Sequence, residues 1–445
     1  MPLRAKVDES QHSKMTETNG AKPKTGIKVI IVGAGFGGLT TAIECLRQGH
    51  TPVIYESFPE LKVLGDIISF GSNAGRIVHR WSNGLVSERM LLLSIDLHKS
   101  GFQIHKWDTG EIVMDQRTPA HEKDAPMFTG HRGEFHEVVF NYAKEIGVEI
   151  HLGQRVENYW ENENAAGIVL ADGTKVEGDV VVGGDGVRSR ARTLILGYED
   201  RAKSSGYAIW RSWFSAKDML ADPETAQFCE NGDSFHGWIG PDVHFLFSTV
   251  KGGKDCAWVL THKDDHDIDE SWSFPGNLDE VKELLKPWDP MCTKIISKTP
   301  EKNLVDWKLL YRDPLPTWVS GYGDAPGHGR MCLVGDAAHP FLPTSTQGAT
   351  QALEDGVTLA IALRKAGKAN IKGALRAYQD IRYERVRKVQ KTGETTRELW
   401  HKTDWEHVKA NPESIKLPQE DWILGHDAVK HAEEVGDAAI AKASA

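Results

Sequence analysis

The sequence lacks the cysteine pattern of a disulfide-stabilised or zinc-binding protein. Its five cysteines are scattered and odd in number, and no two of them form a CxxC pair. This usage is typical of buried thiols in a reducing compartment, so we expect an intracellular, cytoplasmic protein. His50, His105 and His136 have no carboxylate or cysteine at metal-ligand spacing, and no metal is predicted. The sequence contains no GxSxG elbow, so this motif does not indicate a serine hydrolase.

Long apolar runs and an excess of positive charge are also missing. No apolar stretch reaches the roughly 18 residues of a membrane-spanning helix, and the polar first 25 residues do not resemble a secretory signal. We expect those residues to form a disordered arm and the charged C-terminal end to be a solvated tail rather than a membrane-surface helix. The 53 basic and 63 acidic residues give a net charge of −10, so no nucleic-acid partner is expected.

What is present suits a globular protein of two or three domains. The 445 residues are too many for one core, and 40% of them are hydrophobic. Buried-strand and helix patterns alternate near both ends, whereas short alternating strands fill the middle. The expected parts are an arm at 1–25, a nucleotide-binding domain at 26–204 and 311–365 with some substrate-domain segments in 66–130, an inserted sheet at 205–310, and C-terminal helices and tail at 366–445.

A glycine-rich loop lies between the first predicted strand, at 27–32, and a predicted helix at 39–48. Residues 33–38 read GAGFGG, and a second strand at 52–56 ends on an acid, Glu56. Gly33 permits a tight turn, Gly35 lets the backbone approach a pyrophosphate, and Gly38 allows close packing of helix on strand. Glu56 can accept hydrogen bonds from a ribose. The pattern predicts a dinucleotide site but does not separate NAD from FAD, and without a ligand the same loop is simply a glycine-rich turn.

Two later stretches also combine a strand end with polar turn residues. Gly184-Asp185-Gly186 follows a short apolar strand, and in isolation it is more readily a plain turn than a binding element. Gly335-Asp336 follows a buried strand, and a helix begins near Gly348 after a Pro-rich loop. An acid at a strand end can bind a sugar hydroxyl, and a helix start favours negative charge. Ser345, Thr346 and Gln347 are predicted to cap that helix.

In this order the three elements resemble the group A flavoprotein monooxygenases, relatives of para-hydroxybenzoate and salicylate hydroxylases, over roughly residues 27–395. The resemblance implies an α/β fold: an FAD/NAD(P)-binding Rossmann-like domain, an inserted antiparallel-sheet substrate domain and a helical C-terminal region. It also implies FAD, NADPH or NADH, and O2, with oxygen transfer from a flavin C4a-hydroperoxide. The implied cofactor-binding residues are Gly33, Gly35, Gly38, Glu56, Ser69, Arg132, Asp185, Asp336, Gly348 and Ala349.

A narrower resemblance links Gly65-Asp66, SNAGRIVHRW at 72–81 and SGYAIWR at 205–211 to fungal monooxygenases of indole-alkaloid pathways. It implies hydroxylation or epoxidation of an aromatic or indole-type metabolite, with a spiro-oxindole as one outcome. The implied catalytic residues are Arg211, as a hydrogen-bond donor, and Asp66, which holds it. His339 is expected to be structural or flavin-adjacent rather than an acid–base catalyst. Trp210, Trp213 and Trp238 are candidates for a substrate-facing wall or for ordinary packing.

Two other functions remain compatible with the sequence. An FAD oxidase or dehydrogenase on the same fold would form hydrogen peroxide or use another electron acceptor, without inserting oxygen. A binding or escort protein would have eroded flavin motifs, but every motif glycine and acid is in place here. Because fold does not prove function, the fate of the oxygen atoms is what separates the oxidase or dehydrogenase alternative from a monooxygenase.

Overall fold

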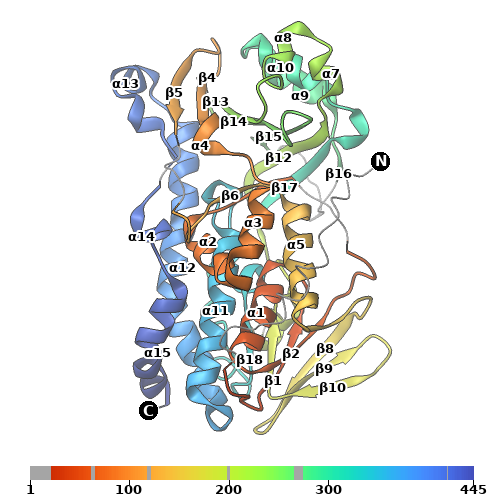
Figure 1. Cartoon of the computed structure of the whole chain (residues 1–445), viewed down its shortest axis with the longest axis vertical. Coiled ribbons are helices and arrows are strands. Elements are labelled where there is room, and N and C mark those ends of the chain that lie inside the picture. The colour runs from red at the N-terminus through yellow and green to blue at the C-terminus, as the bar shows by residue number, and fades with distance from the viewer. Residues whose placement is uncertain are drawn as a thin grey trace.

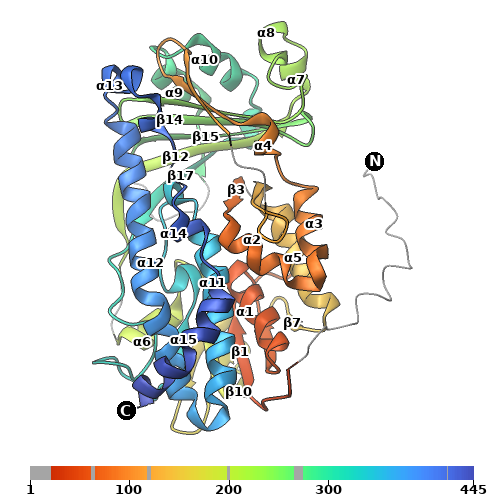
Figure 2. The ribbon, with the colours of Figure 1, turned by 60° about the vertical axis from the view of Figure 1, so that its left-hand side comes forward.

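The computed structural model describes residues 22–61, 66–117, 122–197, 201–264, 274–417 and 419–444. Residues 1–21 of the expected disordered arm at 1–25 lie outside the described ranges, and so does Gly65. The chain forms two stacked bodies, and a long C-terminal helix runs beside both (Figures 1 and 2).

The lower body is built on a five-stranded parallel sheet in the order β18-β11-β1-β2-β7. These strands are β1 (Lys28–Val32), β2 (Thr51–Tyr55), β7 (Glu149–His151), β11 (Val180–Gly183) and β18 (Met331–Leu333). Their β-branched runs are buried on both faces, as expected for parallel strands. The β1–turn–helix–β2 unit predicted from the glycine loop is therefore present.

Helices cover one face of this sheet and a small sheet covers the other. The main core joins the strands to α1 (Phe36–Arg47), α5 (Arg132–Glu145) and α11 (Gly348–Ala366). On the opposite face β8 (Val156–Glu161), β9 (Ala166–Leu170) and β10 (Lys175–Gly178) form an antiparallel sheet. The remaining elements are β3 (Ile67–Phe70), β6 (Phe128–His131), α2 (Ser72–His79), α3 (Leu85–Leu91), α4 (Leu97–Ser100) and α6 (Arg190–Leu196).

The upper body is an eight-stranded sheet in the order β16-β17-β12-β15-β14-β13-β4-β5. Its strands are β4 (Phe102–Lys106), β5 (Ile112–Gln116), β12 (Lys203–Ser215), β13 (Ser234–Gly240), β14 (Val243–Val250), β15 (Asp255–Lys263), β16 (Phe274–Pro275) and β17 (Val305–Tyr311). The sheet is antiparallel, as predicted, except that β4 pairs with β13 in parallel. This exception arises because β4 and β5 come from an earlier segment of the chain and add to the sheet edge.

The sheet has two different faces. The outer face packs under α7 (Lys217–Leu220), α8 (Pro223–Ala226), α9 (Leu278–Leu285) and α10 (Pro290–Ser297). The inner face looks down onto the lower body (Figure 2). Because side chains alternate along a strand, each residue of β12 belongs to one of these two environments.

The C-terminal region is α12 (Ile371–His401), α13 (Trp405–Ala410), α14 (Asp421–Leu424) and α15 (Ala428–Ser444). The expectation of a solvated tail is wrong, because α15 packs against α11 and α12 and buries Ala428 and Ala432. Arg364 pairs with Glu433 at 2.6 Å. None of the helices within the described ranges is long and apolar enough to cross a membrane.

Candidate active site

Three glycine turns meet at the carboxyl edge of the parallel sheet. They follow β1 at Gly33, β11 at Gly184 and β18 at Gly335. The Gly184 N–H donates to the carbonyl of Val32 at 2.8 Å, and the Val334 N–H donates to the carbonyl of Gly183 at 3.0 Å. This edge is where open α/β sheets bind their ligands. Motifs about 150 residues apart in sequence thus become neighbours because their strands are neighbours.

The first turn is shaped for a close approach of backbone to a ligand. Gly33 has φ +101°, and a Cβ there would lie 2.3 Å from the Gly184 carbonyl oxygen. A Cβ on Gly38 would lie 2.0 Å from the Gly33 oxygen. A Cβ on Gly35 would meet no atom within 4 Å, and α1 starts there without a side-chain cap. Free helix N–H groups beside open space fit a pyrophosphate.

Two side chains hold this turn by its Ala34 peptide groups. Glu56 Oε2 accepts a hydrogen bond from the Ala34 N–H at 2.8 Å. On the other side His136 Nε2 donates to the Ala34 carbonyl at 2.6 Å. Burial lowers the pKa of His136, which favours the neutral ring. The sequence analysis considered His136 only as a metal ligand; its spacing of four residues from Arg132 on one helix face was the available signal.

The second turn leaves one carboxylate oxygen without a partner. Asp185 Oδ2 accepts from the Tyr159 hydroxyl at 3.0 Å and from the Arg190 N–H at 2.8 Å. The other oxygen, Oδ1, is buried and has no hydrogen-bond partner in the described part of the chain. Gly186 has φ +78° and open space where a Cβ would point. A spare acceptor beside an open turn fits a hydroxyl-bearing cofactor.

The third turn presents Asp336 toward Arg132 at the start of α5. Residue Asp336 is exposed to solvent, but the protein atoms that remain around its carboxyl group partly desolvate it. That surrounding raises the pKa of its carboxyl group, against the opposing charges of His339, Arg132 and Arg192. The backbone of this turn is held in place because the buried Asp355 carboxylate accepts a hydrogen bond from the Gly335 N–H at 2.9 Å.

His339 belongs to the support of this turn rather than to its surface. The ring is 3% exposed, and its Nε2 lies 2.6 Å from Asp355 Oδ2. Asp355 also accepts from Arg382 Nε at 2.9 Å. Both pairings lower the pKa of the Asp355 carboxyl, although its burial acts in the opposite direction. These contacts position the turn that carries Asp336.

The start of α11 is left open toward the same edge. Gly348 and Ala349 are half-buried, and Gln347 at the N-cap makes no side-chain cap hydrogen bond. The predicted side-chain capping is therefore wrong: Ser345 Oγ accepts from the Gln347 N–H at 3.2 Å instead. The first N–H groups of the helix remain available for an anion or an electron-rich ring.

The two predicted catalytic residues form an ion pair where the upper sheet meets the lower body. Arg211 Nη1 lies 2.6 Å from Asp66 Oδ2, with the side chains 19% and 18% exposed. The Asp66 carbonyl also accepts from the Arg132 N–H at 2.9 Å. These contacts form a continuous series: Arg211 pairs with Asp66, the Asp66 carbonyl binds the Arg132 N–H, and the Arg132 charge acts on the Asp336 carboxyl group. Ser69 lies in the adjoining β3–β6 pair, with Oγ 3.0 Å from Thr129 Oγ1.

The inner face near Arg211 is aromatic, but only one of the three predicted tryptophans belongs to it. Trp213 is half-buried there, with its ring 4.5 Å from the His131 ring. Trp210 and Trp238 lie in the outer core, so they are wrong as substrate-facing residues. The spacing of three between Trp210 and Trp213 already puts them on opposite faces of a strand. Trp307 on β17, which the sequence analysis missed, shares the inner face through its pairing with Ile209.

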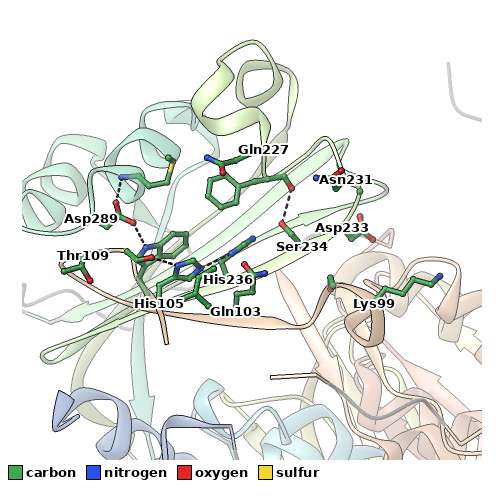
Figure 3. A pocket seen from close by; sticks show the side chains of 17 residues that line it. Lys99, Gln103, His105, Thr109, Gln227, Asn231, Asp233, Ser234, His236 and Asp289 are labelled. Carbon is green, nitrogen blue, oxygen red and sulfur yellow. Dashed lines mark hydrogen bonds between the residues drawn. The ribbon is translucent and has the colours of Figure 1, made fainter. Parts of the chain in front are cut away.

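A separate cavity of about 600 Å³ opens on the outer side of the upper sheet, away from these residues (Figure 3). His105 and His236 lie on its floor, with His105 Nε2 3.0 Å from His236 Nδ1. His105 Nδ1 donates to the Gly110 carbonyl at 3.0 Å, so the His236 proton lies on Nδ1 and its Nε2 is an acceptor. That Nε2 atom is itself shielded from solvent. The pair therefore closes the cavity floor rather than offering a ligand group.

Comparisons with known proteins find relatives that match nearly the whole chain. A family model described as "FAD binding domain" matches residues 26–392. The asperlicin C monooxygenase of Petromyces alliaceus is 37% identical over 95% of this chain and 91% of its own length. The structure of CtdE in complex with FAD and a substrate superposes with a TM-score of 0.86, at 32% identity over 94% of this chain and all of that chain. FqzB gives a TM-score of 0.83, at 33% identity over 94% and 95%.

The open first turn, the unpartnered Asp185 oxygen and the exposed Asp336 are consistent with the FAD shown in the CtdE complex. The described residues contain no group of three or more potential metal ligands. The arrangement thus offers a nucleotide edge, a charged pair beside it and an aromatic sheet face above.

Proposed function

The chain belongs to the FAD-binding-domain family and is an FAD-dependent monooxygenase, and on this premise we propose that it oxygenates an aromatic or indole-type secondary metabolite with O2 and NAD(P)H. One oxygen atom enters the substrate and the other leaves as water, with two electrons from the nicotinamide. Epoxidation of an indole 2,3-bond, leading to a spiro-oxindole, is the specific reaction proposed.

The observation that carries this proposal is the Arg211–Asp66 ion pair at the junction of the two bodies. A guanidinium placed there can donate hydrogen bonds to an oxygen acceptor, while the carboxylate fixes the fork. The neighbouring half-buried ring of Trp213 supplies an apolar surface against which a planar substrate can pack. The relative named for asperlicin C and the substrate complex of CtdE support a small-molecule substrate.

The cofactor-binding roles are likewise proposals. The α1 start with Gly33, Gly35 and Gly38 would bind the pyrophosphate, and Glu56 the adenosine ribose. Asp336 would accept hydrogen bonds from the ribityl chain, next to Arg132. Gly348 and Ala349 would direct N–H groups toward the ring end, with Ser69 and Asp185 at the flanks. When bound, FAD supplies electron transfer from the nicotinamide and the activation of O2.

Arg211 is proposed to stabilise the negative charge that develops on the departing oxygen atom while the other oxygen atom is transferred to the substrate. Hydrogen-bond donation to developing negative charge in a partly water-excluded site typically contributes a hundredfold or more to the rate. Asp66 keeps the guanidinium in place and balances its charge. Neither residue binds the nucleotide end of the cofactor, so their replacement should leave FAD bound.

The test is incubation of the yellow protein with ¹⁸O2, NADPH or NADH, and a panel of indoles and phenols. Mass spectrometry should find one ¹⁸O atom in a product made by the wild type. Arg211→Ala should retain FAD but lose about a hundredfold or more in product formation. Peroxide without labelled product from the wild type would indicate an oxidase instead, and normal turnover by Arg211→Ala would remove Arg211 from the mechanism.

A further inference from the structure

The guanidinium of Arg211 is held from two sides. Asp66 Oδ2 lies 2.6 Å from Nη1, and the centre of the Trp307 ring lies 4.8 Å from Cζ. Trp307 reaches this position from the strand next to that of Arg211. Its direct partner across the ladder is Ile209, two residues before Arg211 on the same face. The cation therefore lies between a carboxylate of the lower body and an indole ring of the upper sheet.

The two contacts control different properties of the guanidinium. Asp66 binds one nitrogen and balances the positive charge, which by itself weakens the cation as a donor. The ring face of Trp307 attracts the cation through its quadrupole and adds no charge. It also restricts the plane of the fork, because an arginine side chain otherwise has several rotamers of similar energy.

Part of the fork is left for another acceptor. Within the described ranges, Asp66 is the one hydrogen-bond partner that Arg211 has, through Nη1. Arg211 and Trp307 are both only partly buried, so a molecule at this junction can contact their side chains. The direction of the remaining guanidinium N–H groups follows from the plane that the ring imposes.

We propose that Trp307 is a positioning residue for oxygenation, holding Arg211 in the plane from which its spare N–H groups meet an oxygen acceptor at the reacting centre. The inference rests on the proposed function, in which Arg211 donates to that acceptor.

A purely structural tryptophan would behave differently on substitution. Trp307→Phe keeps an aromatic face under the guanidinium, whereas Trp307→Leu keeps an apolar side chain and removes the ring. If the ring orients Arg211, Trp307→Leu should lose about tenfold in the single-turnover rate of product formation, and Trp307→Phe should recover most of it. NAD(P)H oxidation should continue in both, with the lost product appearing as peroxide.

Trp160→Leu is the matched control. Trp160 is another half-buried strand tryptophan, on β8 of the small sheet, on the far side of the parallel sheet from the helical core. Product per NAD(P)H should stay at the wild-type value in that variant. Bound FAD, measured from the visible absorbance, should be complete in all of these proteins, which separates a fold or cofactor defect from a positioning defect.

A double-mutant cycle with Arg211→Gln decides whether Trp307 acts through the guanidinium. The loss caused by Trp307→Leu should disappear in the Arg211→Gln background, since coupled contacts are non-additive. If Trp307→Leu lowers the rate of product formation equally in both backgrounds, or in neither, the inference about Trp307 is wrong. The proposed function would not be affected by that result. If the wild type forms no labelled product, the proposed function fails and this inference falls with it.

Discussion

At the scale of single residues, Asp336 combines an exposed carboxylate with an unfavourable surrounding. Its pKa is raised by the protein atoms around it, so in the free protein the charged form costs folding stability above the ordinary aspartate range. A cofactor whose hydroxyls donate to this carboxylate would relieve that cost. The residue is thus arranged for a ligand rather than for the fold.

Replacement of Asp336 separates these two effects. Asp336→Asn and Asp336→Ala should weaken FAD binding by about tenfold to a hundredfold, the value of a hydrogen bond to a charged group. The melting temperature of the cofactor-free protein at neutral pH should stay the same or rise, because the disfavoured charge is gone. Fluorescence titration with FAD and thermal melts of the apoprotein measure the two quantities.

The proposed role of Asp336 also predicts how the affinity for FAD changes with pH. FAD affinity of the wild type should fall as pH falls through the raised pKa, since the neutral carboxyl is the weaker acceptor. Asp336→Asn should lack this part of the pH profile. A variant that purified fully yellow, with unchanged affinity, would contradict the role assigned to Asp336.

At the scale of elements, α1, which begins at the first turn, crosses α11, whose Asp355 holds the Gly335 N–H of the third turn. A Cβ on Gly37 of α1 would lie 3.4 Å from Ala352 of α11, an ordinary contact. A Cβ on Gly356 would lie 2.7 Å from the Thr41 backbone nitrogen, which is too close. The two helices approach this closely because Gly356 has no side chain.

Gly356→Ala should therefore push the helices apart and destabilise the protein by about 1–3 kcal/mol. FAD should dissociate more readily, since α1 begins next to the Gly33 turn and Asp355 of α11 holds the Gly335 turn. Gly436→Ala on α15 is the control, because its Cβ would meet the flexible Lys365 side chain at 2.8 Å, which can move aside. Denaturant melts would show comparable stability for both variants if the crossing were loose.

The sequence predicted those parts of the fold whose signals are local. The strand-turn-helix around Gly33, the acid Glu56 and the strand before Asp336 could be identified because glycine, acid and apolar run stand side by side in the chain. Trp307 could not be assigned a role, since its role depends on a neighbouring strand, and the spacing of His136 from Arg132 indicated its helix face but not its partner, the Ala34 carbonyl. The packing of α15 and the parallel pairing of β4 with β13 are likewise long-range choices.

At the scale of the whole molecule, buried neutral histidines make the fold sensitive to acid. Burial, reinforced by a neighbouring histidine in each case, lowers the pKa of His236 and of His244 to about 3. Below the ordinary histidine pKa the unfolded chain takes up protons that the folded chain does not. Stability is therefore present above about pH 6.5 and is lost as pH falls toward 3.

Thermal or urea melts should show stability falling by up to about 1.4 kcal/mol per pH unit for each such histidine between pH 6.5 and 4.5. Removal of one of them, as in His236→Phe, should make this slope shallower whatever its effect at neutral pH. The carboxylates of Glu354 and Asp355, whose pKa values are lowered, act only at more acidic pH. A flat stability profile over this window would contradict the assignment of neutral rings.

The wide separation of the three turns in sequence has a consequence for how the protein is made. The turn at Gly33 leaves the ribosome early, but the strand and helix that carry Asp336 and Gly348 follow about 300 residues later. The upper sheet must be synthesised in between, and α15, which packs against α11, follows later still. A nascent chain without these later elements therefore lacks part of the proposed flavin site, and we expect FAD to bind only after they have been synthesised.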